Sequence, residues 1–312
     1  FMDFKVATAA VFPHRANYVV AIDGFLKREG LLRAVGCICK RKFTNDIVLI
    51  KQLKYVIDRG DIAVVYPEAR YSLCGTTAIL PESLGKLAKL LKVPVVTLIC
   101  HGHHVNSPFW NLTDRKLKGT QATMKQIFTA DELKTKSVEE INDIIRNEFY
   151  YDDFAWQKEN GIVVDFPKRA EGLHKVLYQC PNCKAEYKMS SEGKILRCDA
   201  CGKEWEMTEL GELRAAKGKT EFSHIPDWYE WERKNVRREV DDGKYYFHSA
   251  VRVDSLPNAD GYIDLGKGTL THDKNGFLLE GEYKGEKYVL EKPVASLYSC
   301  HIEYEYLGKY GD

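Results

Sequence analysis

Four cysteines in two closely spaced pairs constrain the fold of this chain more than any other feature. The pairs are Cys180-Pro-Asn-Cys183 and Cys198-Asp-Ala-Cys201, with fourteen residues between them, and Gly202 follows the second pair. Each pair can wrap a tight turn around one metal ion, and four thiolates complete the closed tetrahedral set of a structural zinc site. Strand-like segments flank the pairs, so we expect a zinc ribbon whose small core depends on the ion. Unrelated core cysteines or redox pairs are the alternative, which this spacing disfavours.

Length and charge limit the remaining choices. A chain of 312 residues is long enough for two or three domains, and 46 Lys+Arg against 45 Asp+Glu give a net charge of +1. Near-neutral charge gives no global reason to expect nucleic acid as a partner. Every apolar run is shorter than the roughly 18 residues that a membrane-spanning helix needs. The first residue is Phe1 rather than methionine, which favours a truncated fragment. Cysteine pairs of the metal-binding kind favour a reducing, cytoplasmic compartment.

Strand-like and helix-like segments alternate through residues 1–160. This alternation is typical of an α/β domain, and we expect a mostly parallel sheet with flanking helices. The capping-box pattern Ser137-x-x-Glu140 predicts the start of one helix. The expected strands are 15–23, 61–67, 93–100 and 119–128, and the expected helices are 44–60, 81–92 and 137–149.

The second half changes in composition. We expect a connector at 161–178, the zinc ribbon at 179–212 and a β-rich C-terminal module at 213–312. The stretch 225–240 interleaves aromatic and basic residues, which favours an amphipathic helix packed on its own domain over a nucleic-acid-binding face. The turn Asp273-Lys-Asn-Gly276 predicts a hairpin within an antiparallel sandwich or small barrel. Strands are expected at 244–253, 261–272, 276–283, 286–291 and 299–308.

Charged residues stand where expected elements of the first half end. In an open α/β sheet, ligands bind beyond the carboxyl ends of the strands. Four segments, taken in order, resemble blocks of the glycerolipid acyltransferase family, the 1-acylglycerol-3-phosphate (lysophosphatidic acid) acyltransferases and their relatives. That family carries His-x-x-x-x-Asp, a Gly-x-Ile segment ending in a basic residue, Phe-Pro-Glu-Gly-Thr-Arg-Ser, and Val-Pro-Val-Val. The matching segments are "FMDFK" (1–5), "GCICKRKFTND" (36–46), "VVYPEARYSL" (64–73) and "VPVV" (93–96).

The resemblance runs from residue 1 to about 110, and more loosely to 160. It implies acyl transfer from acyl-CoA or acyl-ACP to a glycerophosphate-type acceptor, lysophosphatidic acid giving phosphatidic acid. Asp3 matches the aspartate that orients the histidine base, and Glu68 matches the glutamate that holds the glycerol portion. Lys42, with Arg41 beside it, falls where the family has a basic residue, and Arg70 lies one position from the family arginine. The resemblance implies that these residues bind the acceptor phosphate. The implied partners are a lipid substrate, a membrane surface and acyl carrier protein.

The chain departs from the family pattern in two places. The family histidine would lie five positions before Asp3 and therefore before Phe1, so we expect this chain to be inactive, or nearly so. Ala69 replaces the glycine of the third block, Tyr71 stands where the arginine belongs, and Arg70 is displaced by one residue.

Alternatives stay open at several of these positions. Arg41 and Lys42 also suit a solvated basic turn, and Arg70 also suits a surface ion pair with Glu68. The "HGHH" stretch at 101–104 follows the Val-Pro-Val-Val strand, so it suits either a catalytic or ligand role in the same cleft or a solvated turn. The segment 25–43 mixes Leu, Phe, Lys and Arg, which suits either a core-facing helix or an anionic membrane interface.

The sequence therefore predicts a glycerolipid acyltransferase domain with a structural zinc ribbon and a C-terminal β module, located in the cytoplasm and peripheral at the cytoplasmic face of the membrane. A non-catalytic lipid- or phosphate-binding protein on the same scaffold is the first alternative. A zinc-ribbon nucleic-acid adaptor is the second, and the near-zero net charge disfavours it.

Overall fold

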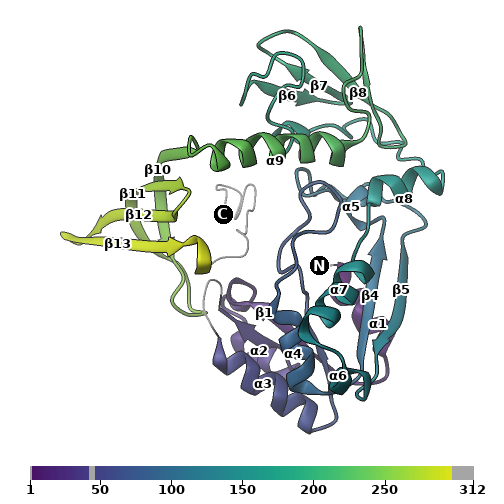
Figure 1. Ribbon diagram of the computed structural model, residues 1–312, viewed down its shortest axis with the longest axis vertical. Coiled ribbons are helices and arrows are strands. Elements are labelled where there is room, and N and C mark those ends of the chain that lie inside the picture. Colours follow the sequence, from purple (N-terminus) through teal and green to yellow (C-terminus); the bar gives the residue numbers. More distant parts are fainter. Residues whose placement is uncertain (1, 42–45, 297–312) are drawn as a thin grey trace.

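A computed structural model describes residues 2–41 and 46–296 (Figure 1). The first half of the chain contains short strands separated by helices. Its helices are α1 (Met2–Val11), η1 (Ile22–Phe25), α2 (Glu29–Ala34), α3 (Ile47–Asp58), α4 (Ser83–Leu91), α5 (His103–Asn106), α6 (Glu132–Thr135), α7 (Val138–Glu148) and α8 (Asp153–Glu159). Its strands are β1 (Ala16–Ala21), β2 (Ile38–Lys40), β3 (Ile62–Val64), β4 (Val95–His101) and β5 (Gln121–Phe128).

The prediction of a mostly parallel sheet is wrong. The parallel sheet has three strands in the order β2-β1-β3, and the two outer strands are three residues long. Strand β4, expected to extend this sheet, instead pairs antiparallel with β5 from Val95↔Phe128 to His101↔Gln121. The remaining sheets are antiparallel as well.

The connection after β4 determines how this strand pairs. A connection that begins and ends at the same end of a sheet makes neighbouring strands antiparallel, whereas a crossover to the opposite end makes them parallel, and residues 102–120 make a connection of the first kind. Strand β5 is the next strand after β4 along the chain, and it takes the hydrogen-bonding edge of β4. Leu98 of β4 still packs against the core of Tyr18, Phe25 and Cys37 beside the parallel sheet. The contact between these layers is therefore made by side chains.

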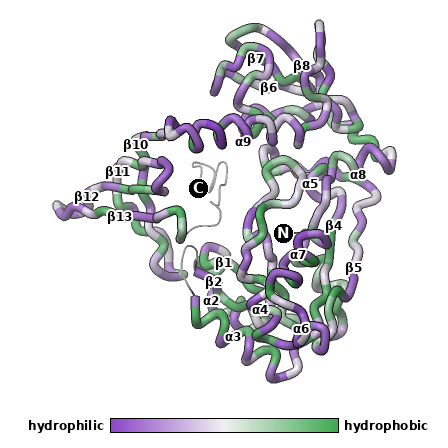
Figure 2. The backbone as a smooth tube through the Cα atoms, viewed as in Figure 1, coloured by the Kyte–Doolittle hydropathy of each residue, from purple (hydrophilic) through white to green (hydrophobic). Residues whose placement is uncertain are grey.

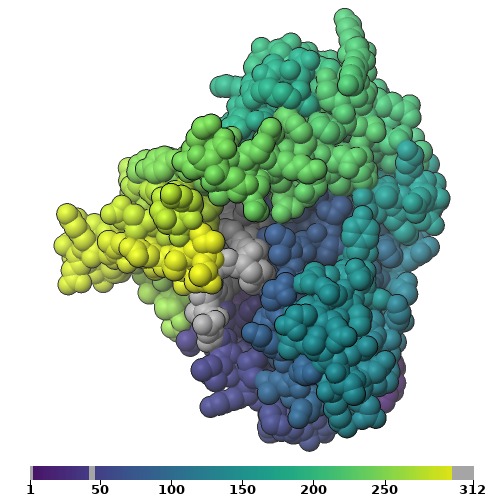
Figure 3. All heavy atoms as spheres, in the orientation of Figure 1, coloured from purple at the N-terminus to yellow at the C-terminus, as the bar shows by residue number. Residues whose placement is uncertain are grey.

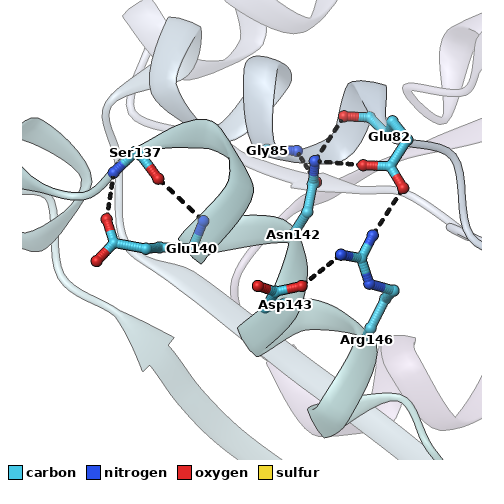
Figure 4. Close-up of polar contacts among 7 residues, drawn as sticks. All are labelled: Glu82, Gly85, Ser137, Glu140, Asn142, Asp143 and Arg146. Atoms are coloured by element: carbon cyan, nitrogen blue, oxygen red, sulfur yellow. Dashed lines mark hydrogen bonds and ion pairs between the residues drawn. The ribbon is translucent and has the colours of Figure 1, made fainter.

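Buried polar contacts fasten α7 to α4 (Figure 4). The Asn142 side chain donates to the main-chain oxygen of Glu82 at 2.9 Å and accepts from the Gly85 amide at 2.8 Å. Ser137 and Glu140 form the capping box that the sequence predicts, so this helix start is confirmed. Asn142 is 4% exposed, so its amide replaces water for both α4 groups.

The second half builds a four-stranded antiparallel sheet around the cysteine pairs. Its strands are β6 (Met189–Glu192), β7 (Ile195–Cys198), β8 (Glu204–Met207) and β9 (Leu213–Ala215), and the short helix η2 (Leu173–Lys175) precedes them. The helix α9 (Ile225–Asp241) packs on this sheet through its first half, where Ile225, Trp228 and Glu232 are buried. The stretch 225–240 is thus a helix, as expected. Figure 2 shows the largely hydrophilic character of α9 along its length.

A single apolar core joins this sheet to the first half of the chain. The cluster contains Cys74, Trp110 and Phe154 from the first half together with Trp205 and Trp228. The segment 161–178, expected as a connector, contributes five buried residues to the same cluster: Val164, Ala170, Leu173, Val176 and Leu177.

The C-terminal module is a four-stranded antiparallel meander at the far end of α9 (Figure 1). Its strands are β10 (Tyr246–Ser255), β11 (Ile263–Asp273), β12 (Gly276–Tyr283) and β13 (Glu286–Pro293), followed by η3 (Val294–Ser296). The turn at 273–276 joins β11 to β12, so the predicted hairpin is confirmed. The strand expected at 299–308 lies outside the described residues. Figure 3 shows this module projecting from the rest of the molecule.

Across residues 2–41 and 46–296, helices with both the length and the apolar character needed to cross a bilayer are absent.

We predict that Asn142→Ala lowers the free energy of unfolding by roughly 2–3 kcal/mol, because it leaves the Gly85 amide and the Glu82 carbonyl without their buried partner. Denaturant unfolding measures the change. Asp143→Ala is the matched control, since Asp143 is an exposed neighbour on the same helix that pairs with Arg146. Equal losses for both variants would contradict the role assigned to Asn142.

Candidate functional site

The four cysteines of the two pairs converge on one point. All four Sγ atoms lie within 4.8 Å of one another. Cys180 and Cys201 are 3.8 Å apart, and Cys183 and Cys198 are 3.7 Å apart. Cys180 and Cys198 are buried, whereas Cys183 and Cys201 are exposed. The set can therefore hold one metal ion at the edge of the ribbon, as the sequence predicts.

Helix α9 fixes the chain immediately before the first ligand. The Gln179 amide donates to Glu232 at 2.9 Å, and the Trp228 indole donates to the Gln179 carbonyl at 3.0 Å. Burial raises the pKa of Glu232 to about 9, so this carboxyl is neutral at pH 7. Both the amide and the carbonyl of Gln179 are therefore bound by α9.

Helix α1 places Asp3 beside the small parallel sheet. The Phe4 ring lies 4.5 Å from the Tyr18 ring of β1, and the Thr8 hydroxyl lies 2.8 Å from the Tyr18 hydroxyl. These contacts fasten one side of α1 to the sheet and leave Asp3, in its first turn, 59% exposed.

The loop after β3 carries Glu68 and Arg70. The Ala78 amide donates to Glu68 at 3.1 Å, which folds the loop back on itself. The Tyr151 amide donates to the Thr77 hydroxyl at 2.9 Å, which ties the loop to the segment between α7 and α8. The Tyr151 side chain lies next to this loop and forms a hydrogen bond with Glu68.

Electrostatics show that Asp3 and Glu68 share one neighbourhood. Burial raises the pKa of Glu68 to about 7, hydrogen bonds from Ala78 and Tyr151 and the charge of Arg70 oppose this rise, and the charge of Asp3 adds to it. Burial and the Asp3 charge also raise the pKa of Tyr66 to about 12. We call the group formed by Asp3, Tyr66, Glu68, Arg70 and Tyr151 the Asp3–Glu68 cluster.

The histidine-rich stretch after β4 borders this cluster. His103 Nδ1 lies 3.9 Å from Asp3 Oδ1, and His101 Nδ1 lies 4.0 Å from Asp153 Oδ1. Asp153 is 1% exposed and accepts hydrogen bonds from the amides of Gly102 and His104. The stretch is therefore an anchored turn against α8 rather than a solvated one.

The structure brings only some of the sequence-predicted residues together. Asp3, Glu68 and Arg70 meet in the cluster. Arg41 instead directly follows β2, and its amide donates to Asp46, the residue that caps α3, at 3.3 Å. Lys42 lies outside the described residues.

Tyr151 and Asp153 are site residues that sequence reasoning missed. They stand in "YYDDF", which has no motif spacing and reads as the start of a helix. The Tyr151 phenol has a raised pKa because of burial and the neighbouring charges of Glu68 and Asp153. Only the tertiary contact between Thr77 and residue 151 reveals this placement.

A concavity of about 540 Å³ lies elsewhere, between α8 and the ribbon. Its lining includes Phe154, Lys158, Leu210 and His224, and His224 pairs with Asp152 at 2.7 Å. Within the described part of the chain, this lining contains none of the sequence-predicted site residues.

Comparison with protein-family models, curated proteins and solved structures gave no significant match, so a proposed function has to rest on the geometry of the site.

We predict that Glu68→Gln flattens the pH dependence of stability. The folded pKa of about 7 exceeds the ordinary value, so the native state keeps a proton that the unfolded state releases. The free energy of unfolding should therefore fall as pH rises from about 4 to 7, by on the order of 2–3 kcal/mol from this group. Denaturant unfolding at several pH values measures the slope. Glu192→Gln, at the exposed end of β6, is the control, and an unchanged slope in Glu68→Gln would contradict the prediction.

Proposed function

We propose that the chain is a glycerolipid acyltransferase that transfers an acyl chain from acyl-CoA or acyl-ACP to a glycerophosphate-type acceptor, lysophosphatidic acid. The enzyme would work in phospholipid synthesis, in the cytoplasm and peripheral at the cytoplasmic face of a membrane. Nucleic acid is not part of this proposal. The observation that carries it is the convergence of Asp3 with Glu68 and Arg70. Asp3 is more than sixty positions away from the other two residues in the sequence, yet its charge and that of Arg70 both act on the Glu68 carboxyl.

The backbone at Ala69 gives further support. Ala69 has a φ of 53°, in the left-handed region that favours glycine. The resemblance aligns this position with the glycine of the family's Pro-Glu-Gly block. The loop thus keeps the conformation for which glycine is suited, at a cost of about 1–2 kcal/mol for the Cβ.

The proposed chemistry is proton transfer coupled to acyl exchange. The resemblance puts a histidine five positions before Asp3, oriented by that carboxylate. Its imidazole takes the acceptor hydroxyl proton, the resulting alkoxide attacks the thioester carbonyl, and the thiolate leaves and takes the proton back. Arg70 binds the acceptor phosphate through charge-assisted hydrogen bonds, and Glu68 accepts from the glycerol portion.

A non-catalytic lipid- or phosphate-binding protein is the second candidate. Tyr71 favours it, because this residue stands in the arginine position of the family block and is 41% exposed beside Phe109. Such a protein would bind the acceptor without turnover.

We further propose that the metal ion is a structural zinc. A Zn–S bond of about 2.3 Å separates tetrahedral thiolates by about 3.8 Å, which agrees with the 3.7 and 3.8 Å separations above. Four thiolates leave no open coordination position, so the ion would stabilise the ribbon without taking part in acyl transfer.

We predict that Arg70→Gln raises the KM for lysophosphatidic acid about tenfold or more, because the phosphate loses a charge-assisted hydrogen bond. The assay follows thiol release by the chain preceded by a segment that places histidine five positions before Asp3. The chain without that segment should show little turnover. Arg237→Gln, which removes an exposed cation from the second half of α9, is the control. An unchanged KM in Arg70→Gln would sink the assignment of this residue, and acceptor binding without turnover in the extended chain would favour the second candidate.

We predict one zinc ion per chain, lost in Cys198→Ser together with several kcal/mol of stability. Metal analysis gives the stoichiometry, and near-ultraviolet circular dichroism reports the packing of Trp205 and Trp228, whose rings are 5.0 Å apart. Cys37→Ser is the control, since Cys37 is buried in another core. Full zinc content and an unchanged spectrum in Cys198→Ser would contradict this role.

A further inference from the structure

An exposed apolar and basic surface covers α2 and the first turn of α3. Leu31 is 66% exposed, Ile47 70% and Val48 61%, and Val35 is also exposed. Five of the six residues of α2 are exposed, so this helix is not the core-facing element that was one of the two expectations for 25–43. Large apolar side chains gathered at one surface mark an interaction site. The α2–α3 surface is defined by these four residues and the exposed cations Lys27, Arg28, Arg33 and Arg41.

The two helices border the same strand. The charges of Arg33 and Glu29 on α2 act on the Cys39 thiol of β2. The charge of Asp46, which caps α3, acts on the same thiol. Strand β2 is an outer strand of the parallel sheet, and the two helices cover opposite faces of that sheet: Leu32 of α2 packs with Tyr18, and Leu49 of α3 packs with Val19. Lys27 and Arg28 follow β1, whereas Arg41 and Ile47 follow β2, so the first turns of both helices stand at the carboxyl edge of these parallel strands.

Charge on this surface is one-sided. The surface has four exposed cations, and the described residues between Phe25 and Ile50 contain two acids, whereas the whole chain has a net charge of only +1. Both acids are engaged locally: Glu29 pairs with Arg33 at 2.6 Å, and Asp46 accepts from the Leu49 amide at 3.0 Å. The excess of cations complements an anionic surface.

The surface also shares an edge with the proposed site. Strands β1, β2 and β3 are parallel, so their carboxyl ends meet at one edge of the sheet. The chain reaches the start of α3 from the end of β2, and it reaches Glu68 from the end of β3. A planar partner bound at the α2–α3 surface would therefore lie beside the loop that carries Glu68 and Arg70.

We propose that the α2–α3 surface docks the protein on an anionic lipid bilayer. Leu31, Ile47 and Val48 enter the boundary between headgroups and acyl chains, while Lys27, Arg28 and Arg41 contact lipid phosphates. This inference rests on the proposed function, because docking brings the acceptor-binding loop to the membrane from which a lysophospholipid comes.

Co-sedimentation with vesicles tests the proposal independently of activity. The full chain is mixed with vesicles of phosphatidylcholine alone or with phosphatidylglycerol added, without lysophospholipid or thioester. We expect binding only to the anionic vesicles, weakened by salt. The double variants Ile47→Ser/Val48→Ser and Lys27→Gln/Arg28→Gln should each lower the affinity for anionic vesicles at least about tenfold.

Matched variants elsewhere control for general loss of apolar area or charge. Val289→Ser/Leu290→Ser changes two exposed apolar residues of β13, and Lys217→Gln/Lys219→Gln removes two exposed cations from the ribbon. Both should bind vesicles like the parent chain. Arg70→Gln should also bind normally even where it impairs acyl transfer, which separates failure of the docking proposal from failure of the proposed function.

Three outcomes would overturn the proposal. The first is equal binding by the parent chain and both surface variants. The second is self-association of the parent chain that Ile47→Ser/Val48→Ser abolishes, which would assign the surface to a second copy. The third is salt-sensitive RNA binding lost in Lys27→Gln/Arg28→Gln without any vesicle binding, which would assign it to nucleic acid.

Discussion

The packing of Trp205 against Trp228 is the contact on which the arrangement of the chain depends. Both indoles are fully buried, and their core continues without a break to Trp110 and Phe154 of the first half. The ribbon strand that carries Trp205 is only four residues long, and its neighbour β7 ends at Cys198. The cysteine-bearing sheet is therefore part of the main core rather than a satellite domain attached by a flexible link.

Two carboxyls show how neighbours decide what a glutamate can do. Glu232 is buried, accepts a hydrogen bond from a backbone amide and has a pKa of about 9, which makes it a neutral structural group. Glu68 is half-buried, and the hydrogen bond from the Ala78 amide and the charge of Arg70 oppose the effect of burial, so its pKa is about 7. A carboxyl that changes charge near physiological pH beside an arginine suits ligand binding. The same type of side chain is thus a neutral hydrogen-bond partner in α9 and a group that titrates near neutral pH after β3.

Local signals in the sequence predicted local structure well. Cysteine spacing located the four-cysteine cluster that can hold a metal ion, and the Ser137–Glu140 box and the Asn275-Gly276 turn located a helix start and a hairpin. Strand pairing was not predictable in the same way, because the apolar run of β4 suits a parallel or an antiparallel partner equally. Likewise His103 and Tyr151 reach Asp3 and Glu68 only through tertiary contacts, so composition and spacing around them contain no sign of it. The parallel sheet was overestimated because β2 and β3 are only three residues long and β4 pairs outside it.

The hydrogen bonds around Gln179 have a mechanical consequence. This residue directly precedes Cys180, and α9 binds both its amide and its carbonyl. The cysteine cluster and the first half of α9 are therefore joined through a single residue of the main chain. The C-terminal meander follows the other end of the same helix, beyond Asp241 (Figure 1). Helix α9 is thus the element through which a change in geometry at the four cysteines would reach the β10–β13 sheet.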